Sequence, residues 1–173
     1  GPVSTLVRQS MADKKRLYFG LIGDLAFFYD MNILGNRHIA NNVRICLVNN
    51  NLGVEFRLNK RLTEDVNPYV AAAGHNGSAR AWAESMGFLY MSAKDEKEFA
   101  EHVDDFCDPN VNRFKQPVLF EVFTTAEGEI EGLDAICRES VKQPKKCSNV
   151  VKAISCFIPD KQKRRDFRRK HSH

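Results

Sequence analysis

A chain of 173 residues with 43% hydrophobic and 28% charged side chains has the composition of a globular domain with a buried core. No apolar run approaches the roughly 20 residues of a membrane-spanning helix, and the start of the chain shows no export signal. The five cysteines are scattered and form no C-x-x-C pair, which is typical of reduced thiols. These features exclude a disulfide scaffold and favour a cytoplasmic protein.

The net charge of +4 is unevenly distributed along the chain. Residues 141–173 carry eleven Lys and Arg against two Asp, a net charge of +9, whereas residues 1–140 carry a net charge of −5. Within the basic part, an apolar helical pattern over residues 150–158 precedes a Lys- and Arg-rich cluster, as in segments that lie on anionic lipid. We expect a domain over residues 1–140 and a basic amphipathic tail over residues 141–173. The tail either contacts an anionic surface, peripheral to the inner membrane, or is simply solvated; without a recognition motif, nucleic acid is not expected.

Apolar strand-like runs alternate with helical patterns along the first 125 residues. In chain order, the patterns predict a helix over 3–11, a strand over 17–22, a helix over 28–39, a strand over 43–48, a helix over 79–86, a strand over 88–91, a helix over 99–106 and a strand over 117–123. This order predicts an α/β fold in which helices flank a parallel sheet. Because a helix opens the chain, we expect the first strand of that sheet to be missing. The polar segment 49–78, rich in Asn and Gly, has the character of a functional loop.

Polar residues follow two successive strands at the point where each strand ends. Gly23-Asp24 follows the strand 17–22, and Asn49-Asn50-Asn51 ends the strand 43–48. Ligands bind at the carboxyl ends of parallel strands in open α/β sheets. If the two strands are neighbours, Asp24 and Asn50 face the same crevice, and their oxygens suit Mg²⁺. The alternative is that Asp24 caps a helix and the Asn run makes a turn.

This spacing resembles the thiamine-diphosphate motif, in which a Gly-Asp pair precedes an Asn-Asn pair by roughly 25 to 30 residues. The string Gly-Asp-Leu-Ala-Phe-Phe-Tyr-Asp-Met-Asn over residues 23–32 is similar to the branch of menaquinone-pathway 2-succinyl-5-enolpyruvyl-6-hydroxy-3-cyclohexene-1-carboxylate synthases. The resemblance covers residues 1 to about 135 and is strongest over residues 20–53. It implies the diphosphate-binding domain of a thiamine-diphosphate-dependent carboligase or decarboxylase that acts on a 2-oxo acid.

The resemblance assigns roles to individual residues. Asp24 and Asn50 would bind Mg²⁺ through their side chains, and the backbone carbonyl of Leu52 would be the third protein ligand. Backbone groups would approach the diphosphate at three further positions, namely Gly23, Leu25 and Ala26. Asn49 would brace the loop. Leu52 stands where many relatives have Gly, so its backbone angle bears on the metal geometry.

The resemblance also implies a partner. Members of the family take an activating glutamate from a pyrimidine-binding domain, usually on another subunit, and no acidic residue of this chain lies in a matching motif. The isolated chain is therefore expected to be inactive and to work with such a domain or subunit in a homo-oligomer. The alternative is a non-catalytic scaffold or subunit that keeps the fold and docks to a partner or membrane surface.

Two further features lie outside that motif. His75, flanked by Gly74 and Gly77, is either a catalytic group that handles protons near the cofactor or a residue of a surface loop. Residues 157–168 resemble terminal segments of bacterial surface-polysaccharide synthesis proteins, which implies that pathway. Because the basic tail and the His75 loop are not part of the synthase resemblance, we expect a related reaction rather than the menaquinone one.

Overall fold

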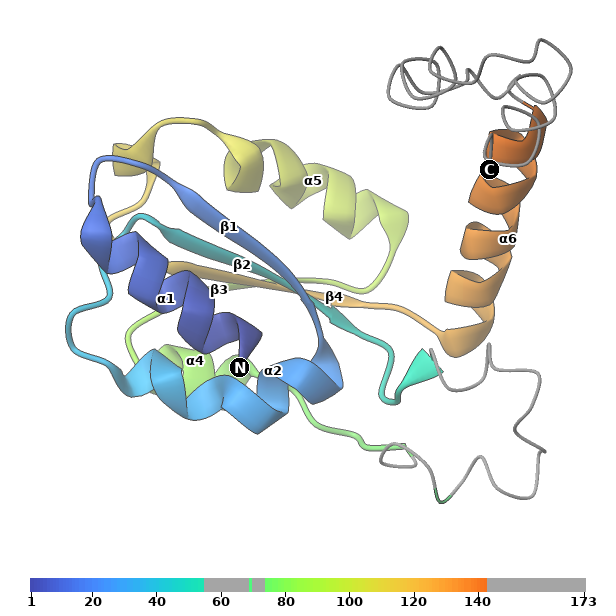
Figure 1. Ribbon diagram of the computed structural model, residues 1–173, viewed down its shortest axis with the longest axis horizontal. Helices are drawn as coiled ribbons and strands as arrows, with labels where there is room; N and C mark the ends of the chain where they lie inside the picture. Colours follow the sequence, from blue (N-terminus) through green and yellow to red (C-terminus); the bar gives the residue numbers. More distant parts are fainter. Residues whose placement is uncertain (55–68, 70–73, 143–173) are drawn as a thin grey trace, which may run out of the picture. The chain divides into compact units, whose positions relative to one another are not determined.

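The computed structural model describes residues 1–54, 69 and 74–142. The strands of this part form one parallel sheet in the order β1-β2-β4-β3 (Figure 1). Their bounds are Tyr18–Gly23 for β1, Val43–Asn49 for β2, Leu89–Ala93 for β3 and Val118–Phe123 for β4. The predicted α/β fold, with a parallel sheet flanked by helices, is confirmed.

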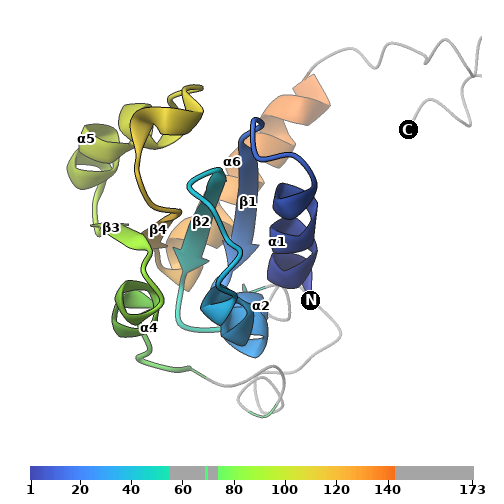
Figure 2. The same cartoon turned by 90° about the vertical axis from the view of Figure 1, so that its left-hand side faces the viewer.

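Helices cover both faces of this sheet. One face carries α1 (Pro2–Ala12), α2 (Asp24–Asp30) with the 3₁₀ helix η1 (Met31–Gly35) that continues it, and α4 (Arg80–Ser85). The opposite face carries α5 (Glu96–Cys107), and Figure 2 shows α1 and α5 on either side of the strands. A short 3₁₀ helix, η3 (Val111–Arg113), leads into β4. These two layers of helices leave the ends of the strands free for a site.

The core divides in two because side chains alternate between the faces of a strand. Val43, Ile45 and Leu47 of β2 pack beneath α1, α2 and α4, in a cluster that also contains Phe27. On the other face, Phe106 of α5 packs with a smaller cluster that includes residues of β4. β2 is the most completely buried strand of the described sheet, since it has a neighbour on each side and helices above and below.

The strand predicted over residues 17–22 is less buried than expected. β1 lies at an edge of the described sheet, and its residues alternate between half-buried and exposed. Phe19 contacts Phe106 of α5 with their ring centroids 5.8 Å apart, yet it remains 48% exposed, and Leu21 is 78% exposed. The prediction of a buried strand is therefore wrong for the face of β1 that carries Phe19 and Leu21.

The helices differ from their predicted bounds in two places. The helix expected over residues 28–39 begins earlier, at Asp24, and its 3₁₀ continuation ends at Gly35. A further helix, α6 (Ala126–Lys142), was not predicted. Of the predicted basic tail, only residues 141 and 142 belong to the described part of the chain, so the 157–168 resemblance lies outside it. Within the described residues, no helix is long and apolar enough to cross a membrane.

Candidate functional site

Asp24 is the first residue after β1 and the first residue of α2. Its carboxylate is almost fully buried, with the side chain 3% exposed. Oδ1 accepts a hydrogen bond from the backbone N–H of Leu25 at 2.7 Å, and Oδ2 lies 3.1 Å from Nε2 of His75. Each carboxylate oxygen has a second lone pair beyond these contacts. Asp24 therefore offers a buried negative charge with coordination capacity left over.

The Asn run begins at the last residue of β2 and continues beyond it, beside Asp24. Because Gly23 pairs with Val48 in the parallel register of β1 and β2, Asp24 and the Asn run leave the sheet at adjacent positions. Strands that pair in this way lie about 4.8 Å apart. The condition for a shared crevice, that the two strands are neighbours, is met.

The three asparagines have different tasks. Asn49 is fully buried, and its Nδ2 donates to the Gly77 carbonyl at 2.9 Å and to Glu121 at 2.7 Å, so it braces the loop as expected. Asn50 is half-buried and points its amide oxygen at the backbone N–H of Leu52, 2.9 Å away. Asn51 has a φ of +64°, the left-handed conformation that Asn tolerates better than most residues.

The left-handed turn therefore falls at Asn51 and not at Leu52. Among the described residues other than glycine, Asn51 alone has a positive φ. Leu52 therefore needs no glycine-like backbone angle, so having Leu where many relatives have Gly does not disturb the backbone at this position. The carbonyl of Asn51 in turn accepts the backbone N–H of His75 at 2.9 Å, which ties the His75 loop to the end of β2.

His75 is brought next to Asp24 from 51 residues away. Its Nδ1 accepts the backbone N–H of Gly77 at 3.0 Å. A neutral imidazole has one donor and one acceptor nitrogen, so the proton lies on Nε2, which donates to Asp24. The edge of the ring also packs against Phe28, with centroids 5.2 Å apart. With its side chain 24% exposed and in contact with Asp24, His75 is not a free surface residue.

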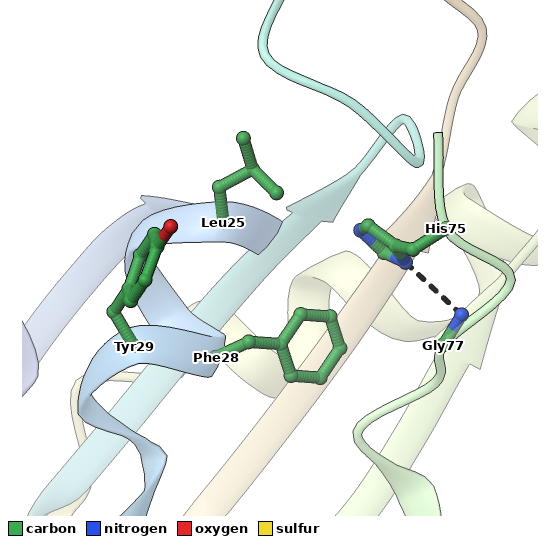
Figure 3. A pocket seen from close by; sticks show the side chains of 5 residues that line it. All are labelled: Leu25, Phe28, Tyr29, His75 and Gly77. Carbon is green, nitrogen blue, oxygen red and sulfur yellow. Dashed lines mark hydrogen bonds between the residues drawn. The ribbon is translucent and has the colours of Figure 1, made fainter. Parts of the chain in front are cut away.

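A hollow of about 400 Å³ opens beside this pair (Figure 3). Its walls come from α2 and from the His75 loop, and its lining residues are Leu25, Phe28, Tyr29, His75 and Gly77. Tyr29 is 85% exposed, an unusual state for a large aromatic side chain on the wall of a cavity. The hollow is apolar, and none of its lining residues is acidic.

Glu121 is a buried hydrogen-bond hub behind the site. It lies in the middle of β4 and is fully buried. Besides Asn49, it accepts hydrogen bonds from the Ser78 hydroxyl at 2.7 Å, the Ala79 backbone N–H at 3.1 Å and the Tyr90 hydroxyl at 2.6 Å. Burial, together with the hydrogen bond to Glu121, raises the pKa of Tyr90 to about 12. This hub joins the end of β2 to the segment that follows His75.

A second glutamate, Glu129 of α6, binds the side chain of Asn50 in the Asn run. Its Oε2 accepts a hydrogen bond from Nδ2 of Asn50 at 2.9 Å, and its Oε1 accepts one from the hydroxyl of Thr124. Neither glutamate was expected from the sequence. A charged residue inside the apolar run 118–123 was an available signal for Glu121, whereas Glu129 is 79 residues from Asn50 and carried none.

The residues at these strand ends fit a magnesium ion and a diphosphate in their chemistry. A carboxylate oxygen of Asp24, the amide oxygen of Asn50 and a backbone carbonyl form the all-oxygen set that Mg²⁺ prefers. A Cβ built on Gly23 would meet no atom within 4 Å, so its backbone borders open space that a ligand can enter. The described residues hold no cluster of three or more His, Cys, Asp or Glu suited to a metal. We call Asp24, the Asn run, Leu52 and Gly23 the strand-end site.

Comparison with known proteins identifies relatives of one kind. No protein-family model matches the chain. It is 43% identical over 126 residues to the 2-succinyl-5-enolpyruvyl-6-hydroxy-3-cyclohexene-1-carboxylate synthase of Bacteroides fragilis, and 41% identical over 126 residues to that of Bacteroides thetaiotaomicron. The synthase of Phocaeicola vulgatus is 39% identical over 128 residues. These matches cover 72–73% of this chain but only 22% of each relative, so the chain spans about a fifth of the length of the curated relatives that it matches. The resemblance predicted from the motif is therefore confirmed, and this chain is a homologue of one segment of the 2-succinyl-5-enolpyruvyl-6-hydroxy-3-cyclohexene-1-carboxylate synthases.

Proposed function

We propose that this chain is the part of a thiamine-diphosphate-dependent synthase that binds Mg²⁺ and the cofactor's diphosphate. The observation that carries the proposal is the position of Asp24 and Asn50, which follow the ends of two neighbouring parallel strands. The open space at Gly23 and the identity to the synthases support it independently. The reaction class is carboligation or decarboxylation of a 2-oxo acid.

In this proposal, residues of the strand-end site and their neighbours have separate tasks. Asp24 and Asn50 hold the ion through side-chain oxygens, and Leu52 adds its carbonyl. Gly23, Leu25 and Ala26 turn backbone groups toward the diphosphate. The bound cofactor supplies the nucleophilic carbon, while the protein binds and orients it. His75, whose Nδ1 is already taken by Gly77, acts as a hydrogen-bond donor that steadies the Asp24 carboxylate.

The proposal includes a protein partner over the apolar hollow. Its lining residues in the described part of the chain include no acidic group, and Glu121 accepts hydrogen bonds within the domain. A pyrimidine-binding domain or subunit supplies the activating glutamate and covers Tyr29, which is 85% exposed in this part of the chain. We further propose that the complete enzyme is a homo-oligomer.

The name shared by the relatives favours the menaquinone-pathway reaction over the surface-polysaccharide pathway expected from the sequence. The residues that suggested polysaccharide synthesis, 157–168, and the basic tail as a whole lie outside the described part, apart from residues 141 and 142. A contact of that tail with an anionic membrane surface stays a proposal. It requires the purified protein to bind anionic vesicles more tightly than neutral ones.

Calorimetry on the full-length protein that contains this chain tests the function. Thiamine diphosphate is titrated with Mg²⁺ present and then with the metal removed by chelation. We expect binding only in the presence of the metal, since the diphosphate and the strand-end site are both negative and the ion joins them. Metal-independent binding would contradict the proposed site. No binding in either condition would favour the alternative, a scaffold that keeps only the fold.

A further inference from the structure

Both the oxygen and the nitrogen of the Asn50 side-chain amide have a hydrogen-bond partner. Its oxygen accepts the backbone N–H of Leu52 at 2.9 Å, and its nitrogen donates to the carboxylate of Glu129, also at 2.9 Å. Turning the amide over would place its NH₂ group against the Leu52 N–H and its oxygen against the carboxylate. Two donors or two acceptors would then face each other, so the observed orientation is strongly preferred.

Glu129 is itself held in place. Its second carboxylate oxygen accepts the hydroxyl of Thr124, and its backbone N–H donates to the Thr125 carbonyl at 3.0 Å in the first turn of α6. Thr124 directly follows β4, and its own N–H donates to the Asn49 carbonyl at 2.9 Å. The Glu129 carboxylate is therefore positioned next to Asn50 by a short, hydrogen-bonded segment that follows β4, the strand paired with β2.

We propose that Glu129 is a positioning residue of the metal site, which fixes the side chain of Asn50 so that its oxygen remains the atom available to the ion. The proposal rests on the function proposed above. A metal ligand that can rotate presents its oxygen for only part of the time, whereas a ligand locked by a second hydrogen bond is ready to bind. Partners of this kind commonly change metal affinity about 10- to 100-fold when they are removed.

The first test measures Mg²⁺ affinity by calorimetry at saturating thiamine diphosphate, on the full-length protein. Glu129→Ala removes the acceptor, and we expect about tenfold weaker Mg²⁺ binding. Glu129→Gln keeps an acceptor for Asn50 and can donate to the Thr124 hydroxyl, so it should restore most of the affinity. Glu131→Gln, which removes an exposed carboxylate two residues further along the same helix, is the matched control and should bind like the wild type.

A double-mutant cycle separates positioning from a general loss of structure. Asn50→Ala removes the proposed ligand, so Mg²⁺ binding should weaken by at least tenfold. Adding Glu129→Ala to that variant should cause little further loss, because Glu129 acts on the ion only through Asn50. The melting temperature without ligands is measured for each variant to confirm that the protein is folded.

The outcomes are distinguishable. Strong coupling between the two positions, with rescue by Glu129→Gln, supports the proposal. Additive effects, or a Glu129→Ala variant that binds Mg²⁺ like the wild type, overturn it while leaving the proposed function intact. A wild-type protein that shows no Mg²⁺-dependent binding of thiamine diphosphate overturns the proposed function, and the role of Glu129 with it.

Discussion

Replacing Gly23 by Ala adds one methyl group at the point where the diphosphate is proposed to pass. Gly23 has φ −77° and ψ 157°, an extended conformation that Ala adopts without strain, and the new Cβ would meet no protein atom within 4 Å. The substitution should therefore leave the fold intact and stabilise the free protein by about 0.5 kcal/mol, because Ala has fewer unfolded conformations than Gly. Cofactor binding should suffer instead, since the methyl group occupies the ligand's approach to the backbone.

The expected loss follows from the interaction that the methyl group displaces. A backbone hydrogen bond to a charged group contributes about 1.5–3 kcal/mol, which corresponds to roughly 10- to 100-fold in affinity. Gly20→Ala is the matched control on the same strand, because its Cβ would approach Cδ2 of Leu6 to 2.7 Å, on the face covered by α1. Crowding of this kind should lower the free energy of unfolding by about 1 kcal/mol and leave the affinity unchanged.

The two variants are compared by urea unfolding of the free protein and by calorimetric titration of thiamine diphosphate with Mg²⁺. We expect opposite effects: Gly20→Ala should lose stability but not affinity, and Gly23→Ala should lose affinity but not stability. A Gly23→Ala protein that binds the cofactor as tightly as the wild type would refute the idea that the diphosphate lies against this backbone.

Two further predictions concern buried polar groups away from the ion. Arg44, fully buried in β2, donates hydrogen bonds to three backbone carbonyls at and beyond the end of α5. Arg44→Met should therefore lower the free energy of unfolding, measured by urea titration, by about 3 kcal/mol. A change below about 1 kcal/mol would contradict this anchoring role. The pKa of Tyr90 is raised in the folded state to about 12, so its neutral hydroxyl contributes stability that is fully present below its unfolded pKa near 10 and is lost as the pH rises toward 12. The wild type should therefore lose stability between pH 10 and 12 more steeply than Tyr90→Phe, and parallel pH profiles would contradict the raised pKa of Tyr90.

The strands and most helices were predictable because their signals are local. The run 43–48 and the run 117–123 are apolar and end at turn residues, and both became strands with nearly the expected bounds. Asp95 is of a residue type that caps helices, and its carboxylate accepts the N–H of Glu98 at 2.8 Å at the start of α5. Such patterns show which face of a helix or strand packs on the core, and they can be read from a few neighbouring residues.

What escaped prediction depends on contacts between distant residues. The exposure of Leu21 follows from its place on an edge strand, which no local pattern encodes. α6, by contrast, carries a local signal, since its apolar residues Ile130, Leu133 and Cys137 recur at helical spacing. The helix over 28–39 ended early because Gly35 and Asn36 outweighed the apolar pattern beyond them.

The candidate site shows the same division. Asp24 and Asn50 were recognisable because each directly follows a strand, and parallel strands bring such ends together. His75 was also a candidate, but its contact with Asp24 and that of Glu129 with Asn50 were not predictable, since they join residues 51 and 79 positions apart. The motif thus identifies the groups proposed to touch the ion, whereas the groups that orient them come from loops and helices whose position only the folded chain determines.

The position of a bound metal ion would test the proposed site directly. Crystals of the full-length protein grown with thiamine diphosphate and Mn²⁺ in place of Mg²⁺ would locate the metal by its anomalous scattering. We expect one ion about 2.1 Å from a carboxylate oxygen of Asp24, the amide oxygen of Asn50 and the carbonyl of Leu52, with the diphosphate beside Gly23. A bound cofactor whose metal lies away from Asp24 and Asn50 would contradict the proposed site.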